Sequence, residues 1–344
     1  MSGVEEAELL ERLRTRIGVA DAPTPARDPV NQPMIRHWCD AMGDHNPVYT
    51  DPEFASESIH GEIVAPPPML NAWTMPGNVP RPADSGGAMA GVLSRLDEAG
   101  FTSVVATNSE HEYLRYLKLG DHLAGAGTLS DVSGEKRTAL GSGHFVTTTT
   151  EYRTRSGELV GNMKFRILKF KPGTGRAAGA AAGAPEAGAP ADLPPAPDRR
   201  ETTLRFEEVA VGDELPPCPI PITATLIVAG AIASRDYQDV HHDRDLAVLR
   251  GSPDIFMNIL TTTGLCGRYL SDWAGPEALM RRLAIRLGAP NYPHDTMTLS
   301  ASVLSKRSEG GTGLVEVGLR GSNRMGEHVS GNVEIALPSG RAAA

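Results

Sequence analysis

One motif decides the fold, and it occurs twice, as MIRHWCDAMGDHNPVYTD at residues 34–51 and as ATLIVAGAIASRDYQDVHHD at residues 224–243. Each copy begins with apolar residues at helical spacing and continues into a polar turn that starts at Asp44 or at Asp236. The repeat predicts that the chain holds two copies of one structural unit.

Each motif is followed by a second apolar segment, IVAPPPML at residues 63–70 and IFMNIL at residues 255–260. In the second copy the apolar residues keep helical spacing, which predicts a helix over 255–273 that is buried along one face. In the first copy Pro76 and Gly77 interrupt the segment, which predicts a short helix.

Segments of alternating apolar and polar residues follow in both halves, and this period of two predicts antiparallel strands with one buried face. They lie at residues 123–132, 143–154, 157–170, 297–306, 313–322 and 328–337. A helix laid against a curved antiparallel sheet is a hot-dog arrangement. We therefore expect an α+β fold in which two tandem hot-dog units pack together as a double hot-dog.

An Ala/Gly/Pro-rich segment separates the two units. Residues 173–200 have no periodic apolar face that could pack, which predicts a linker. We expect one hot-dog unit at residues 1–172 and a second at residues 201–340. The total of 344 residues is enough for two domains with separate cores.

Composition excludes several classes of protein. The chain has 33 basic and 42 acidic residues, a net charge of −9 and no basic stripe, so we expect no nucleic-acid partner. No apolar run is long enough for a membrane span, and the N-terminus lacks the features of a secretory signal. We therefore expect a cytoplasmic protein without a membrane partner.

The three cysteines, Cys39, Cys218 and Cys266, are too scattered for a disulfide framework or a zinc site. We expect neither a metal nor a cofactor.

These motifs resemble those of the MaoC-like hydratases and dehydratases. The marks of that family are an Asp-x-Asn-Pro-x-His-x-Asp turn, an Ile-Val-His-Gly-Met-Leu helix start and a Gly-Asp turn that opens a strand. The first half, with GDHNPVYTDPEF and GEIVAPPPML, resembles a FAS1-like dehydratase unit, and the second half resembles a MaoC unit. Such a tandem is similar to the hydratase 2 enzymes and to the hydratases of steroid side-chain breakdown.

The resemblance implies a lyase of lipid metabolism that hydrates a 2-enoyl-CoA to a 3-hydroxyacyl-CoA, or catalyses the reverse dehydration. Asp236 and His241, five positions apart as in the family turn, are the implied catalytic pair that holds the reacting water. Asn258 stands at the helix-start position whose backbone amide polarises the thioester carbonyl. We interpret Asp243 as a structural turn residue.

The first half lacks two of these features. Its matching positions are Asp44 and Tyr49, so a phenol replaces the imidazole. Pro68 stands at the amide-donating position, and proline has no N–H to donate. We therefore expect residues 1–172 to bind or scaffold and residues 201–340 to catalyse.

Several alternatives remain open. Gln238 and Asp239 replace the Asn-Pro of the family turn, and Asp236 with His241 can also form a simple capping turn. The thioester can be carried by acyl carrier protein, and a thioesterase or a non-catalytic acyl-CoA-binding subunit can use the same fold. The short first-half helix favours a bulky acyl group, a long chain or a steroid side chain, unless Pro76 only ends a helix that packs elsewhere. A homodimer also remains open.

Overall fold

The computed structural model describes residues 3–79, 88–175 and 195–340. Most of the expected linker at 173–200 lies outside the described residues. Its last part packs against the second half, because the backbone N–H of Arg200 donates to the carbonyl of Asp272.

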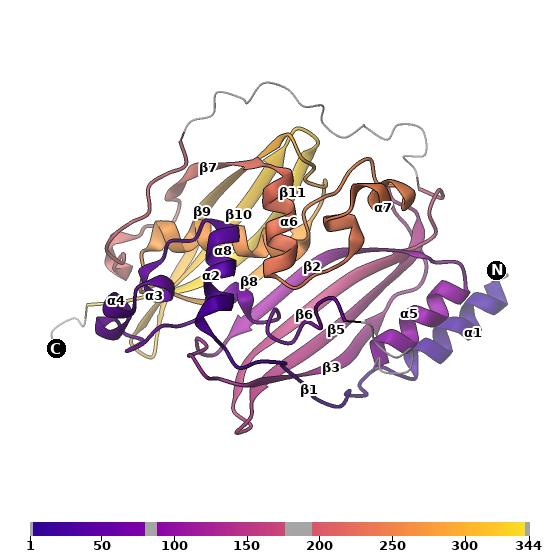
Figure 1. Cartoon of the computed structure of the whole chain (residues 1–344), viewed down its shortest axis with the longest axis horizontal. Helices are drawn as coiled ribbons and strands as arrows, with labels where there is room; N and C mark the ends of the chain where they lie inside the picture. The colour runs from indigo at the N-terminus through magenta and orange to yellow at the C-terminus, as the bar shows by residue number, and fades with distance from the viewer. Residues whose placement is uncertain (1–2, 80–87, 176–194, 341–344) are drawn as a thin grey trace.

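The described strands form one antiparallel sheet, in the order β1-β3-β5-β6-β2-β8-β11-β10-β9-β7, with β4 beside β5 (Figure 1). The first half contributes β1 (Thr24–Pro25), β2 (Ser103–Tyr113), β3 (Leu123–Val132), β4 (Lys136–Arg137), β5 (Ser142–Thr154) and β6 (Leu159–Phe170). The second half contributes β7 (Glu214–Ile222), β8 (Leu279–Leu287), β9 (Asp295–Glu309), β10 (Thr312–Asn323) and β11 (Gly326–Leu337). The six strands that alternation predicts are all present.

The two halves join where β2 pairs with β8, from Asn108 opposite Arg286 to Glu112 opposite Arg282. Beyond the paired residues, the hydroxyl of Tyr116 accepts a hydrogen bond from the backbone N–H of Met280 at 2.8 Å. The double hot-dog expected from the sequence is therefore built on one sheet that runs through both halves.

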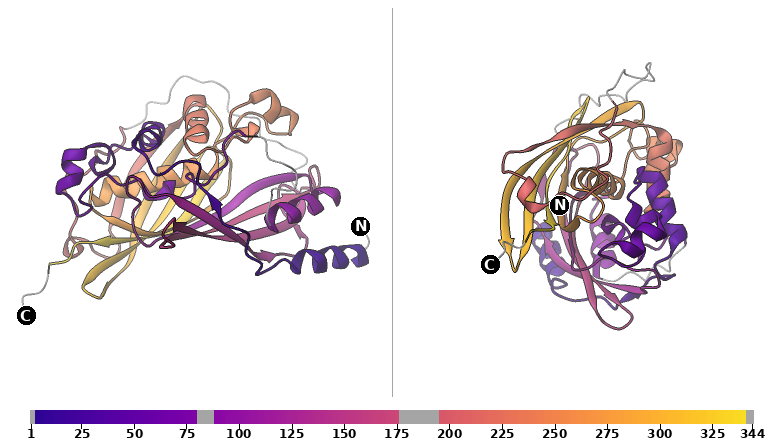
Figure 2. Two further views of the ribbon diagram at one scale, coloured as in Figure 1. Left: turned by 60° about the horizontal axis from the view of Figure 1, so that its bottom comes forward. Right: turned by 90° about the vertical axis from the view of Figure 1, so that its left-hand side faces the viewer.

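The second half contains a long central helix, α8 (Ile259–Ala274), of 16 residues. Figure 2 shows this helix end-on in its right-hand view, with the strands of the second half curving around it. Most of its residues are buried, which fits a helix that lies between a sheet and further helices. It begins four residues later than the sequence predicts, because Asn258 is its N-cap and residues 255–257 run into it as extended chain.

The first half has no helix of this kind among its described residues. The segment after its motif forms only η1 (Pro67–Met69), three residues long, which confirms the expected short helix. Pro76 and Gly77, the latter at φ 71°, follow η1 closely, and both residue types end helices, so no long helix extends from this segment. The inner faces of β2 and β6 are consequently left to line a cavity.

The two motif helices, α2 (Gln32–Met42) and α6 (Ala224–Ala233), pack side by side across the junction (Figure 1). Asn31 caps α2 and Thr223 caps α6, each through a side-chain oxygen that accepts from the first turn. Gly43 ends α2 in the left-handed conformation, at φ 62°, which a side chain would disfavour. Short helices follow both: α3 (Pro47–Thr50), α4 (Pro52–Glu57), η3 (Asp239–His241) and α7 (Arg244–Leu249).

A separate small core lies at the far end of the first half, beneath α1 (Gly3–Arg14) and α5 (Ala88–Glu98). Its buried members include Leu13, Leu96 and Phe101. The remaining short helix, η2 (Phe206–Glu208), precedes β7. Among the helices that the structure describes, none has the length and apolar character needed to cross a membrane.

Candidate active site

The predicted pair lies together at the end of α6. Asp236 follows that helix after Arg235, which adopts φ 60°, and His241 closes η3. His241 Nε2 lies 3.7 Å from Asp236 Oδ2, and the two residues are only 7% and 9% exposed. The turn therefore brings an imidazole and a carboxylate to one buried point.

The ring of His241 is held by the backbone. Its Nδ1 donates to the carbonyl of Phe256 at 2.7 Å, which leaves Nε2 as the nitrogen that faces Asp236. Burial lowers the pKa of His241, and the neighbouring Asp236 only partly opposes this effect. His241 is therefore a neutral imidazole at neutral pH, with a lone pair on Nε2 that can accept a proton.

Asn258 contributes a side-chain role that the sequence did not indicate. Its Oδ1 caps α8 by accepting from the N–H of Thr261 at 2.8 Å. Its Nδ2 donates to Asp236 Oδ2 and to Ser234 Oγ, both at 3.0 Å. One amide group thus connects the start of α8 to the Asp236 carboxylate and fixes that carboxylate in place.

The backbone at this helix start is free to bind a ligand. Within the described part of the chain, no hydrogen-bond acceptor is recorded for the backbone N–H of Asn258, Ile259 or Leu260. These groups lie at the positive end of the α8 dipole and can donate to a thioester oxygen. The role of the Asn258 amide in polarising the thioester carbonyl stays a prediction.

A cavity of about 250 Å³ adjoins the pair, and residues of both halves line it. The polar residues of the second half in its wall are Asp236, Gln238, His241 and Asn258. The first half contributes an almost wholly apolar wall from β2, β6 and the segment after η1: Asn71, Met75, Val104, Val105, Ala106, Met163, Phe165 and Ile167. Sequence reasoning did not assign these first-half residues to the site, because β2 was not predicted and the cavity forms only where the two halves meet.

The last aspartate of each motif is structural. Asp51 caps α4 by accepting from the N–H groups of Glu53 and Phe54, and Asp243 caps α7 by accepting from Leu246. In this structure Asp243 therefore acts as the structural turn residue that we expected.

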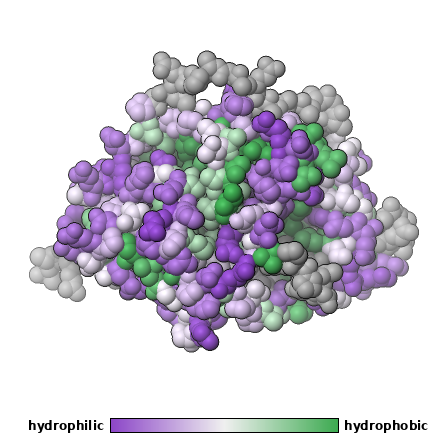
Figure 3. All heavy atoms as spheres, viewed as in Figure 1, coloured by the Kyte–Doolittle hydropathy of each residue, from purple (hydrophilic) through white to green (hydrophobic). Residues whose placement is uncertain are grey.

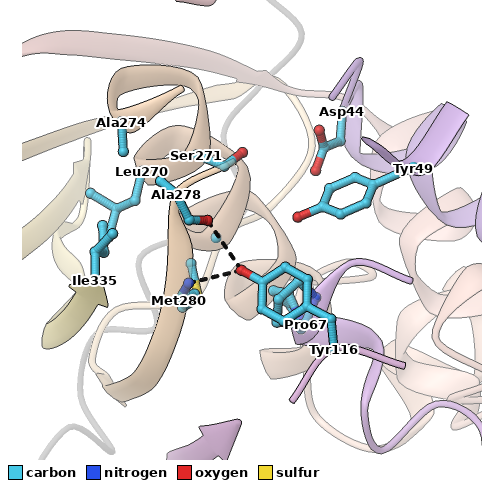
Figure 4. Close-up of a pocket in the computed structure, with 12 residues that line it drawn as sticks. Asp44, Tyr49, Pro67, Tyr116, Leu270, Ser271, Ala274, Ala278, Met280 and Ile335 are labelled. Carbon is cyan, nitrogen blue, oxygen red and sulfur yellow. Dashed lines mark hydrogen bonds between the residues drawn. The ribbon is translucent and has the colours of Figure 1, made fainter. Parts of the chain in front are cut away.

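The equivalent place in the first half is nearly closed. Asp44 and Tyr49 face a cavity of only about 10 Å³, enough for one water (Figure 4). Burial raises the pKa of Asp44 to about 6, despite Arg199 Nη1 at 3.8 Å from its Oδ1. Burial also raises the pKa of Tyr49 well above its usual range, so its phenol stays protonated at neutral pH.

The η1 segment removes the amide donors of this first site. Pro66, Pro67 and Pro68 have no N–H, and the N–H groups of Met69 and Leu70 are already bonded to the carbonyls of Pro66 and Pro67. The Pro68 ring also fills space, because a Cβ placed on Gly267 of α8 would lie 2.5 Å from Pro68 Cγ.

An ion-pair cluster, which the sequence did not indicate, ties the end of the expected linker to this closed site. Arg199 Nη1 lies 2.9 Å from Asp272 Oδ1, and Arg268 Nε donates to Asp272 Oδ2 at 3.2 Å. Asp44 lies at the edge of the same cluster. Arg268 and Asp272 are four residues apart on α8, but Arg199 and Asp44 come from distant parts of the chain, so no local pattern could have revealed their contacts.

A double hot-dog with an aspartate and a histidine beside a helix start whose backbone N–H groups are unpaired in the described structure has the architecture of a hot-dog dehydratase.

Comparisons with known proteins support this class. A family model described as the FAS1-like dehydratase domain region matches residues 17–163. A probable enoyl-CoA hydratase alpha subunit of Thermomonospora curvata is 45% identical over 165 residues, 47% of this chain and 52% of that protein. The 3-oxo-4,17-pregnadiene-20-carboxyl-CoA hydratase beta subunit of Mycobacterium tuberculosis is 49% identical over 127 residues, 37% of this chain and 95% of that protein.

A solved structure named MaoC-like dehydratase superposes with a TM-score of 0.71 at 21% identity, covering 95% of this chain and all of that one. The chain belongs to the MaoC-like hydratases and dehydratases, a family of hydro-lyases, and the fold and family expected from the sequence are confirmed. Its match spans about half the length of the alpha-subunit relative.

Proposed function

We propose that the chain hydrates a 2-enoyl-CoA thioester to a 3-hydroxyacyl-CoA, or catalyses the reverse dehydration, at Asp236 and His241. The observation that carries this proposal is the buried pair, 3.7 Å apart, in the wall of the same cavity as the start of α8. A carboxylate, a neutral imidazole and free backbone N–H groups are the functional groups that hydration of an enoyl thioester requires.

In the proposed mechanism, the pair holds one water between Asp236 Oδ2 and His241 Nε2. The water oxygen bonds to C3 of the substrate, one water proton passes to the pair, and a proton is delivered to C2. The reaction therefore adds one water across the double bond, and the pair returns to its starting protonation state. Asn258 Nδ2 keeps the Asp236 carboxylate oriented throughout.

The thioester carbonyl gains negative charge as oxygen adds at C3. We assign its stabilisation to the backbone N–H of Asn258, assisted by the dipole of α8. Removing a donor of this kind from an oxyanion site costs roughly 10² to 10³ in rate. The N–H is supplied by the backbone, so substitution of the Asn258 side chain does not remove it.

The acyl group occupies the apolar wall contributed by the first half. With a three-residue η1 in place of a 16-residue helix, β2 and β6 line the cavity directly. This arrangement supports a bulky acyl group, such as a steroid side chain or a long chain. The name of the Mycobacterium tuberculosis relative refers to a steroid carboxyl-CoA, which supports the steroid class.

We also propose that one chain supplies both units, residues 1–172 as the non-catalytic unit and residues 201–340 as the catalytic unit. The relatives are an alpha and a beta subunit, and this chain matches both.

A homodimer is our proposal for the assembly. Apolar side chains exposed on α6 and α7 support it, among them Ile232, Val248 and Leu249, the last 81% exposed (Figure 3). Analytical ultracentrifugation of the wild-type protein and of Leu249→Glu tests this proposal.

The activity is tested with purified protein and a panel of enoyl-CoA thioesters from short chains to steroid side chains. Loss of enoyl absorbance without release of free thiol is the expected result. Thiol release would instead identify a thioesterase, and turnover confined to acyl carrier protein thioesters would identify a dehydratase of fatty-acid synthesis. Binding without turnover of any thioester would identify a non-catalytic binding protein.

A further inference from the structure

The apolar wall of the cavity contains one polar residue that the proposed mechanism does not use. Asn71 lies two residues after η1 and is 5% exposed. Its neighbours in this wall, such as Met75, Val105 and Phe165, are all apolar. Asn71 therefore places an amide group in the otherwise apolar part of the cavity wall that the first half contributes.

The Asn71 side chain has no hydrogen-bond partner in the described structure. Its Oδ1 is buried and unpartnered, and its Nδ2 donates to no described residue. The backbone carbonyl of Asn71 accepts from Thr74, but that bond would form with any residue at position 71. A buried, unpaired amide destabilises the folded protein relative to a paired one, so an apolar residue would suit the empty cavity better.

We propose that Asn71 binds an oxygen atom carried by the acyl group at a position remote from the thioester. The substrate class is then an oxygenated, bulky acyl-CoA and not a plain hydrocarbon acyl-CoA. This inference rests on the proposed function and adds the chemistry of the acyl group to it. An asparagine amide can turn about χ2, so it donates to a ketone through Nδ2 or accepts from a hydroxyl through Oδ1.

The polar residues at the reacting end do not account for Asn71. Asp236, His241 and Asn258 all belong to the second half, and their polar groups are oriented by one another and by the backbone. Asn71 belongs to the first half and has no contact of this kind. Its partner must therefore enter with the substrate, along the wall that holds the acyl group.

The test uses three enoyl-CoA substrates with one carbocyclic skeleton, which carry a remote hydroxyl, a remote ketone or only hydrogen at that position. For the wild-type protein we expect kcat/KM to be at least about tenfold higher for one oxygenated substrate than for the hydrocarbon, which corresponds to one buried hydrogen bond. Asn71→Leu should abolish this preference and raise kcat/KM for the hydrocarbon. Asn332→Leu, at an exposed asparagine of β11 outside the cavity, should leave the preference unchanged.

Each outcome decides between the proposals. Equal effects of Asn71→Leu on all three substrates would overturn the role of Asn71, as would a wild-type protein that hydrates all three equally well. If Asn71→Leu fails to fold, the wild-type preference and the milder Asn71→Ser variant still test the role. If the wild-type protein hydrates none of a full enoyl-CoA panel, the proposed function itself fails, which is a different result.

Discussion

The two motif sites of this chain occupy equivalent places in a repeat but differ in three physical properties. The second site has an imidazole, free amide donors at a helix start and a cavity of about 250 Å³. The first has a phenol, prolines in place of the donors and a cavity of about 10 Å³. On our proposal, a duplicated hot-dog unit that has lost its own site still forms the acyl-binding wall of the other.

The largest expected effect separates the two aspartates. Asp236→Asn and His241→Ala should each lower hydration by about 10²-fold or more, the usual loss when a positioned acid or base is removed. Asp44→Asn and Tyr49→Phe should change turnover by less than about tenfold, because they face a cavity too small for substrate. Steady-state kinetics on folded variants, checked by circular dichroism, measure this. Near-full turnover in both second-site variants would contradict the assignment.

The second effect concerns stability at the first site. The pKa of Asp44 is raised to about 6, above its value in the unfolded chain, so ionising it costs stability as pH rises from about 4 to 6. Two pKa units correspond to about 3 kcal/mol. Relative to the wild type, Asp44→Asn should therefore gain up to about 3 kcal/mol in unfolding free energy between pH 4 and pH 7.

Urea unfolding at several pH values measures this difference. Parallel curves for Asp44→Asn and the wild type would show that Asp44 is not held in a desolvated position.

Asn258→Gly should lower kcat by about tenfold, the cost of one hydrogen bond to a buried carboxylate. The substitution keeps the backbone N–H but removes the amide that holds Asp236. Thr223→Gly is the matched control, because it removes the cap of α6 without touching the pair. If both variants lose stability but Asn258→Gly keeps the wild-type kcat, then the Asn258 side chain only caps α8 and does not position Asp236 for catalysis.

A smaller effect is expected in the pH profile. Because burial lowers the pKa of His241 below 6.5, kcat/KM should stay level as pH falls to about 6.5 and decline only below it, when the imidazole becomes protonated. His45→Gln, at an exposed histidine of the first motif, should leave the profile unchanged. An acid limb centred above 6.5 in the wild type would contradict the desolvated environment of His241.

Local patterns predicted much of this structure. The alternation of residues 123–132 and 313–322 identifies strands, and the repeated motif identifies α2 and α6. The spacing of Asp236 and His241 predicts that they lie together, and their side chains are 3.7 Å apart in the structure. Such features depend on neighbours a few positions away, which a sequence displays directly.

Features that depend on distant contacts were not predicted. β7 contains Pro216, Pro217, Pro219 and Pro221, which argue against a strand, yet it forms at the sheet edge where it pairs only with β9. The amide of Asn258 meets Asp236 only through tertiary packing. The apolar cavity wall on β2 likewise exists because the two halves fold against each other.

The most direct test of the central claim, that only the second site catalyses, is an attempt to restore the first. In an Asp236→Asn background, Tyr49→His gives Asp44 an imidazole partner but leaves Pro68 without an N–H and the cavity closed. We expect hydration by this double variant to stay at the level of Asp236→Asn alone, and we expect an added Pro68→Gly to restore activity only if it also opens the pocket. Substantial hydration by the double variant would contradict the account, because it would show that the first half had lost nothing but its histidine.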